Sequence, residues 1–204
     1  MATEATGLQP APKEKRPSPA PAGLKRRFPS MDKFIQWKQP EDGFKYEWVN
    51  GEILKTEKII TAETLHIVRN LNRRFHQTEA FRQGGELICE TEAQLSPTEL
   101  RIPDIAYYTE SQIEGGANGN KPVTPFAIEL ISTNDNYNKS LQKIRAYFNA
   151  GVLVVWHIFP ELKSVHVFTS PVDVTICEGD TVCSAAPAIP DLQITANEVF
   201  YRKF

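Results

Sequence analysis

Two short apolar segments on either side of a helical pattern constrain the fold of this chain more than any other feature. Residues 126–131 and 152–159 are nearly continuous hydrophobic runs of strand length, the kind that a sheet buries on both faces. A helix is expected between them, from Asn134 or Asn136 to Gly151. Its core-facing residues recur at helical spacing: Leu141, Ile144 and Phe148. A strand, a helix and a strand in this order predict parallel strands joined by a right-handed crossover.

A second strong signal is the dipeptide Asn50-Gly51, which lies between two strand-prone runs. It predicts a two-residue hairpin turn within residues 46–54. Thr61 or Thr64 then opens a helix. The buried face of that helix is expected to carry Leu65, Val68, Leu71 and Phe75.

The remaining segments complete a mixed pattern. In chain order we expect a short helix capped by Ser30 and ending near Trp37, strands at 86–95 and 102–108, a loop at 115–120, a strand at 164–169, edge strands within 171–193 and a helical turn at 195–200. The predicted fold class is therefore mixed α/β (α+β), with a central mixed sheet flanked by helices.

The chain is long enough for one well-buried domain. It has 204 residues, of which 41% are hydrophobic. Residues 1–29 are rich in proline, lysine and arginine and are expected to form a disordered tail, whereas the folded domain is expected to span residues 30–204. The tail ends near Lys25-Arg26-Arg27, a run that could touch nucleic acid or simply be solvated.

Charge and cysteine content set bounds on the partners and the compartment. The formal net charge is -2 and gives no sign of a nucleic-acid partner by itself. Cys89, Cys177 and Cys183 lack metal-binding spacing and are expected to be free thiols in a reducing cytoplasm. We expect no membrane span and no secretory signal, because the longest apolar run has only strand length and no apolar segment follows the N-terminus.

Three ionisable residues carry the chemistry that the sequence suggests. Asp104 follows Pro103 at the opening of a strand, Glu129 lies inside an apolar strand, and Lys143 lies on the crossover helix. Two carboxylates that converge near a lysine could hold a divalent cation and an activated water. The alternative is ordinary: Asp104 and Glu129 form structural ion pairs, and Lys143 lies on a solvated helix face.

Several short motifs, taken together in this order and spacing, resemble a known family. They are Tyr46-Glu47-x-x-Asn50-Gly51-Glu52, His66, Pro103-Asp104-Ile105-Ala106, Ile128-Glu129-Leu130-Ile131-Ser132, Lys143-x-x-x-Tyr147, Gly151-Val152 and Val155-Trp156. The sequence resembles a large prokaryotic family of putative restriction endonucleases, formerly a domain of unknown function. That family belongs to the PD-(D/E)xK nuclease superfamily, and the resemblance covers roughly residues 30–200.

The resemblance implies a restriction-endonuclease-like core with a divalent metal at its active site. Asp104 matches the aspartate of the PD motif, and Glu129 matches the second metal-binding carboxylate. Most of the superfamily has a lysine two residues after that glutamate, where this chain has Ile131. The resemblance implies that Lys143, in the next helix, takes the place of that lysine.

Two further positions match the family near the site. Glu52 could complete a second metal shell, and His66 could hydrogen-bond a phosphate or a carboxylate, although it could equally be a histidine packed in its helix. Glu47 matches as well and is interpreted as a structural partner rather than a metal ligand.

The resemblance predicts a metal-dependent endonuclease that hydrolyses nucleic acid, with DNA as the expected substrate. Mg²⁺ is the expected cofactor, with Mn²⁺ as a substitute. Asp104 and Glu129 would hold the metal while Lys143 positions a water. A homodimer is expected because duplex backbones have two-fold symmetry. Two alternatives remain open: a catalytically inactive nuclease fold that only binds nucleic acid, and an oligomeric regulatory module.

Overall fold

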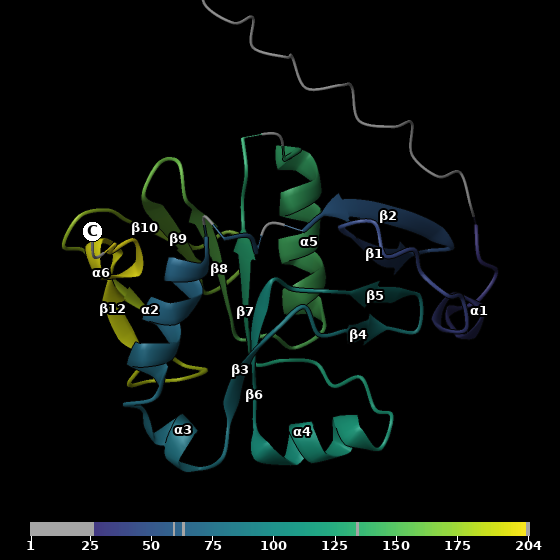
Figure 1. Cartoon of the computed structure of the whole chain (residues 1–204), viewed down its shortest axis with the longest axis horizontal. Helices are drawn as coiled ribbons and strands as arrows, with labels where there is room; N and C mark the ends of the chain where they lie inside the picture. Colours follow the sequence, from purple (N-terminus) through teal and green to yellow (C-terminus); the bar gives the residue numbers. More distant parts are fainter. Residues whose placement is uncertain (1–26, 59, 63, 134, 203–204) are drawn as a thin grey trace, which may run out of the picture.

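A six-stranded mixed sheet forms the centre of the fold (Figure 1). The computed structural model describes residues 27–202 except residues 59, 63 and 134. The strand order is β10-β9-β8-β7-β6-β3. The strands are β3 (Glu86–Cys89), β6 (Ile105–Tyr108), β7 (Phe126–Leu130), β8 (Val154–Phe159), β9 (Ser164–Phe168) and β10 (Val174–Cys177).

The predicted strand–helix–strand unit is confirmed. β7 and β8 pair in parallel, from Phe126 opposite Val154 to Leu130 opposite Ile158. Helix α5 (Tyr137–Asn149) joins them, and the side chain of Asn136 caps it by accepting a hydrogen bond from the Lys139 amide. Glycine is needed at residue 151, where φ is +99° and the chain turns out of the helix into β8.

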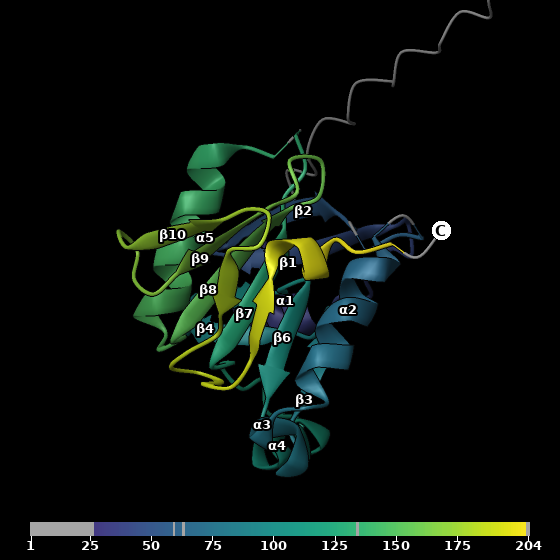
Figure 2. The same cartoon turned by 90° about the vertical axis from the view of Figure 1, so that its left-hand side faces the viewer.

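Helices cover both faces of the large sheet, as Figure 2 shows. Helix α5 lies on one face, where Tyr147 and Ile144 pack against Ala127 and Val155. Helix α2 (Leu65–Phe75) covers the other face together with the C-terminal segment, which contains β11 (Val182–Ser184), β12 (Gln193–Thr195) and α6 (Ala196–Val199). The expected mixed sheet with flanking helices is therefore present.

A second, four-stranded sheet lies beside α5, in the order β2-β1-β5-β4 (Figure 1). Its strands are β1 (Phe44–Val49), β2 (Glu52–Glu57), β4 (Ala93–Ser96) and β5 (Glu99–Arg101). The predicted hairpin turn is confirmed: φ is +49° at Asn50 and +87° at Gly51, so both central residues are left-handed. The small sheet has its own aromatic core, which includes Phe34, Trp37, Tyr46 and Trp48.

The N-terminal end of the folded part is tied to this small sheet. The predicted cap is confirmed, because Ser30 accepts a hydrogen bond from the Lys33 amide at the start of α1 (Met31–Ile35). Phe28 is buried against Phe34 and Trp37, so the packed region begins before residue 30. Residues 1–26, with most of the predicted tail, lie outside the described residues.

Three local predictions differ from the structure. Residues 86–95 form two strands of different sheets, β3 and β4, because the chain turns at Glu90, where φ is +52°. The expected loop at 115–120 is helical as far as Ala117, because α4 (Glu110–Ala117) begins with a capping box between Thr109 and Gln112. In α2, the predicted core residue Leu65 is 54% exposed, whereas Ile67, which was not predicted to face the core, is buried.

Smaller features complete the description. Helix α3 (Glu79–Arg82) follows α2 and starts at the capping residue Thr78. The three cysteines are free thiols, as expected, with Cys177 and Cys183 buried and Cys89 exposed. None of the helices in the described part of the chain is long and apolar enough to span a membrane.

Candidate active site

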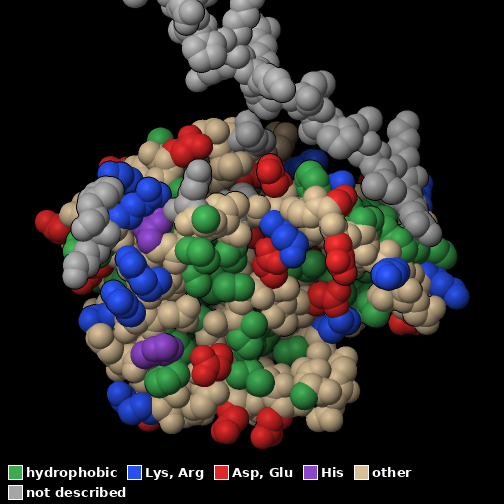
Figure 3. Space-filling model, in the orientation of Figure 1, with side chains coloured by type: hydrophobic (Ala, Val, Ile, Leu, Met, Phe, Trp, Pro, Cys, Tyr) green, Lys and Arg blue, Asp and Glu red, His purple; other side chains and the backbone are tan. Residues whose placement is uncertain are grey.

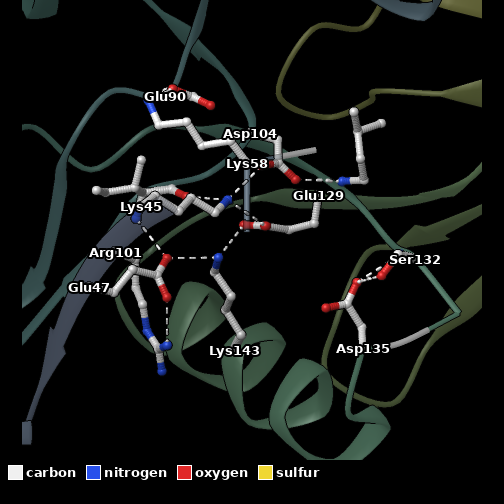
Figure 4. A network of polar contacts seen from close by, with 12 residues as sticks. Lys45, Glu47, Lys58, Glu90, Arg101, Asp104, Glu129, Ser132, Asp135 and Lys143 are labelled. Carbon is white, nitrogen blue, oxygen red and sulfur yellow. Dashed lines mark hydrogen bonds and ion pairs between the residues drawn. The ribbon is translucent and has the colours of Figure 1, made fainter. Parts of the chain in front are cut away.

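A cavity of about 250 Å³ lies between the two sheets, next to the carboxyl end of β7 and the first turns of α5. Asp104, Glu129 and Lys143 all line it. The structure therefore brings together the three residues that the sequence analysis singled out. Figure 4 shows their side chains within one network of polar contacts.

The fold itself fixes the two carboxylates of the predicted trio. Asp104 lies in the connection from β5 to β6, and its Oδ2 accepts a hydrogen bond of 2.8 Å from the Leu130 amide. Glu129 lies on β7, and its Oε1 accepts a hydrogen bond of 2.6 Å from the Tyr147 hydroxyl on α5. Both side chains are almost fully buried, at 1% and 5% exposure for the residues. Buried carboxylates need such partners, because an unpaired charge away from water is costly.

Lys143 links the crossover helix to both sheets. Its Nζ lies 2.8 Å from Glu129 Oε1 and 2.8 Å from Glu47 Oε1. Glu47, on β1, also pairs with Arg101 Nη1 at 3.1 Å and accepts a hydrogen bond of 2.8 Å from the Ile102 amide. The ammonium group is thus held at a fixed point on the cavity wall rather than on a solvated helix face.

Lys45, which the sequence analysis did not select, lies at the centre of the network. Its Nζ is 2.6 Å from Asp104 Oδ1, 3.8 Å from Glu129 Oε2 and 3.0 Å from the Ile102 carbonyl oxygen. Only 3% of its side chain is exposed. Three acidic and three basic side chains therefore balance in the buried cluster: Glu47, Asp104, Glu129, Lys45, Arg101 and Lys143.

The surroundings shift the pKa values of the three carboxyl groups in different directions. Burial raises the pKa of Asp104 to about 6, in spite of the ion pair with Lys45. Burial opposes the ionisation of Glu47 too, but Lys143 and Arg101 lower its pKa to about 2. The pKa of Glu129 is also lowered, because Lys143 and Lys45 outweigh the effect of burial. At neutral pH Glu47 and Glu129 are therefore ionised, whereas Asp104 has its pKa closest to neutrality.

Comparison with known proteins identifies the family. The model of the Uma2 family, described as "Putative restriction endonuclease", matches residues 31–197. The chain belongs to the Uma2 family. The match spans all the residues of the buried cluster, and it confirms the family that the sequence motifs indicated.

A solved structure confirms the fold. The chain is similar to the crystal structure of a putative nuclease belonging to DUF820 from Anabaena variabilis ATCC 29413, with a TM-score of 0.69 and 16% sequence identity. The similarity covers 84% of this chain and 97% of that chain. No curated protein matches the sequence. The Uma2 chain thus shares the fold of that putative nuclease, as the resemblance implied, and it has the mixed sheet with flanking helices that the element order predicted.

Two predicted site residues of this Uma2 chain lie away from the cavity. Glu52 is on β2, where its exposed carboxylate pairs with Arg27 at 2.6 Å. His66 is on α2 and lines another cavity, of about 380 Å³, together with Lys163 and Arg202. Neither residue contacts the buried cluster in any described interaction, so the structure does not bring them to Asp104 and Glu129.

The sequence predicted a site role for neither Lys45 nor Arg101, and it indicated only a structural role for Glu47. One signal was available: Lys45 and Glu47 alternate along β1 and therefore point to the same side of the strand. Their burial could not be read from the strand, because charged residues usually face solvent. It depends on Asp104, Glu129 and Lys143, which lie on that side of β1 and supply the opposite charges.

The oxygens around the Lys45 ammonium fit a divalent cation of the kind that the Uma2 family implies. Asp104 Oδ1, Glu129 Oε2 and the Ile102 carbonyl converge on one positively charged atom. Carboxylate and carbonyl oxygens are the ligands that Mg²⁺ prefers. Within the described residues, no three His, Cys, Asp or Glu side chains are grouped to hold a metal ion. The chain would therefore offer two carboxylates and a main-chain carbonyl.

His157 gives the site a pH dependence that can be measured. Burial lowers its pKa from the ordinary 6.5 to about 4. As the pH falls below 6.5, the unfolded chain protonates His157 but the folded protein does not, so the folded state loses stability relative to the unfolded state. The folded protein therefore has its full stability above pH 6.5 and loses it progressively as the pH falls towards 4. Relative to the variant His157→Gln, wild-type protein should lose up to about 3 kcal/mol of unfolding free energy over that range.

Urea unfolding of both proteins at several pH values between 4 and 7 would measure this difference. The comparison removes the titration of Asp104, which both proteins share. A constant difference between the two curves would show that His157 does not titrate as expected.

Proposed function

We propose that this chain is a metal-dependent endonuclease that hydrolyses phosphodiester bonds of nucleic acid, with DNA as its substrate, and that Asp104, Glu129 and Lys143 form its catalytic centre. The observation that supports this proposal most directly is that two buried carboxylates and a lysine converge on one cavity. Membership of the Uma2 family and the nuclease fold support the same activity.

The residues have distinct tasks in this proposal. Asp104 and Glu129 would hold Mg²⁺ or Mn²⁺, which when bound supplies an activated water and neutralises the charge of the phosphate. Lys143, fixed between Glu47 and Glu129, orients the attacking water and stabilises negative charge on the phosphate oxygens. The Tyr147 hydroxyl holds Glu129 in place, and burial raises its pKa well above the usual range, so it remains a hydrogen-bond donor.

Incubation of the purified protein with plasmid DNA, single-stranded DNA and RNA, with and without Mn²⁺, tests the proposal directly. Metal-dependent strand cleavage is expected, and the preferred substrate would identify the class of nucleic acid. Full recovery of intact substrate in every reaction would contradict the proposed activity.

One observation favours a second candidate, a nuclease fold that binds nucleic acid without cutting it. Each carboxylate of the cluster is already paired with a lysine or arginine of the chain itself. Calorimetry with Mn²⁺ separates the two candidates. Metal binding would support the nuclease, whereas nucleic-acid binding without metal binding would support the inactive module.

Basic side chains on α2 support a nucleic-acid partner. Figure 3 shows Lys, Arg and His side chains gathered over this helix, which carries Arg69, Arg73 and His66. Lys163 lies next to His66 at the edge of the same region. Contacts between such residues and phosphates provide most of the affinity for nucleic acid and make it dependent on salt.

Neutralising two exposed charges of this region should weaken binding to all sequences alike. For the double variant Arg73→Gln with Lys163→Gln, we expect the slope of log affinity against log salt to become shallower by about 1 for each phosphate that the protein no longer neutralises. Lys33→Gln, on the distant helix α1, is the matched control. Fluorescence anisotropy at several salt concentrations measures the slope, and an unchanged slope would place the nucleic acid elsewhere.

Two further expectations stay predictions. A homodimer would match the two-fold symmetry of a duplex, and multi-angle light scattering would give its mass. We also propose a cytoplasmic location, because free thiols suit a reducing compartment.

A further inference from the structure

Lys45 holds the position that a cation between Asp104 and Glu129 would take. Its Nζ contacts Asp104 Oδ1 at 2.6 Å and the Ile102 carbonyl at 3.0 Å, with Glu129 Oε2 at 3.8 Å. An ammonium group and a metal ion compete for the same oxygens, and two cations cannot share so small a space without strong repulsion. A metal can therefore enter only if this ammonium leaves.

The structure offers a place for the displaced ammonium. Lys45 lines the catalytic cavity and also a second cavity of about 500 Å³. Four carboxylates line that second cavity, those of Glu41, Asp42, Glu90 and Glu92. Asp42, Glu90 and Glu92 pair with Lys55, Lys58 and Lys121, so a lysine moving into the cavity would share these carboxylates or pair with Glu41. Figure 4 shows Glu90 and Lys58 near Lys45, and these two residues form an ion pair of 2.6 Å.

We infer that Lys45 is an internal competitor that sets the metal affinity of the site. In the metal-free protein its ammonium neutralises Asp104 and Glu129. In the metal-bound protein the ammonium moves towards the second cavity. This inference rests on the proposed function, because it assumes that Asp104 and Glu129 are metal ligands. It gives Lys45 a role in metal binding, because the site would need a higher metal concentration to fill than it would without this lysine.

Labelling of lysine amines in the wild-type protein tests the movement. Without metal, Lys45 should be protected from reductive methylation, because its side chain is only 3% exposed. Saturating Mn²⁺ should make it react several-fold faster, as read by mass spectrometry, while the exposed Lys33 keeps its rate and serves as the internal reference. Unchanged or stronger protection of Lys45 at saturating Mn²⁺ would overturn the inference.

Calorimetry of substituted proteins tests the competition. Lys45→Met removes the charge and keeps the length of the side chain, so Mn²⁺ should bind about tenfold tighter or more. Lys45→Arg keeps the competing charge and should show no such gain. Equal affinity of wild-type protein and Lys45→Met would overturn the inference alone, whereas absence of Mn²⁺ binding to both would overturn the metal-dependent function as well. If Lys45→Met does not fold, the labelling experiment decides.

Discussion

Replacing Asp104 with asparagine is expected to reduce Mn²⁺-dependent cleavage by at least about 10²–10³-fold, the cost of removing one preorganised electrostatic group from an active site. Asparagine keeps an oxygen that can accept the hydrogen bond from the Leu130 amide, but it lacks the charge that holds a metal. Cleavage of labelled DNA under single-turnover conditions measures the loss.

The control for this variant is Asp173→Asn. Asp173 is an exposed residue between β9 and β10, and its described hydrogen bonds join it only to Thr169 and to the side chain of Ser170. It should cut at the wild-type rate. Thermal melting of both variants checks that the fold is kept. Wild-type cleavage by a folded Asp104→Asn protein would rule out Asp104 as a metal ligand.

The second large effect concerns stability. Glu47→Ala should lower the free energy of unfolding by about 3–5 kcal/mol, because it leaves Lys143 and Arg101 buried without one of their partners. Only 3% of the Glu47 side chain is exposed, and its carboxylate pairs with both of these cations. Chemical denaturation with urea measures the change.

Glu52→Ala on the same hairpin is the matched control. The Glu52 side chain is 58% exposed, and its ion pair with Arg27 is open to solvent. Exposed pairs of this kind contribute at most about 1 kcal/mol. If both glutamate variants lost the same stability, the buried cluster would not be the link between the sheets that the distances indicate.

The hairpin that carries these two glutamates was only partly predictable from the sequence. The Asn50-Gly51 turn was predictable because only residues that tolerate positive φ fit that position. That both faces of β1 would be buried was not predictable. Tyr46 and Trp48 pack in the aromatic core of the small sheet, whereas Lys45 and Glu47 are buried on the other side by ion pairs with residues distant in the sequence.

The proposed catalytic carboxylates were predictable for a similar local reason. Glu129 interrupts an apolar strand, and Asp104 follows a proline at a strand opening, so both stand out against their neighbours. Lys45 and Arg101 did not stand out, because lysine and arginine in short strands usually reach solvent. Their burial becomes visible only when the three carboxylates are placed beside them.

The buried cluster has a consequence for the dynamics of the domain. Lys45, Glu47 and Arg101 come from the small sheet, whereas Glu129 and Lys143 come from the large sheet and its crossover helix. The β1–β2 hairpin packs on the aromatic cluster of the small sheet, whereas β4 shares a hydrophobic cluster with α5 and the large sheet. The hairpin is therefore the part of the small sheet that can open as a local cooperative unit. Ion pairs of the buried cluster join this hairpin to Glu129 and Lys143. The same opening event that lets amide protons of the β1–β2 hairpin exchange with solvent should therefore also abolish the proposed activity. Enzymatic activity would then report on the docking of a hairpin that supplies none of the proposed metal ligands.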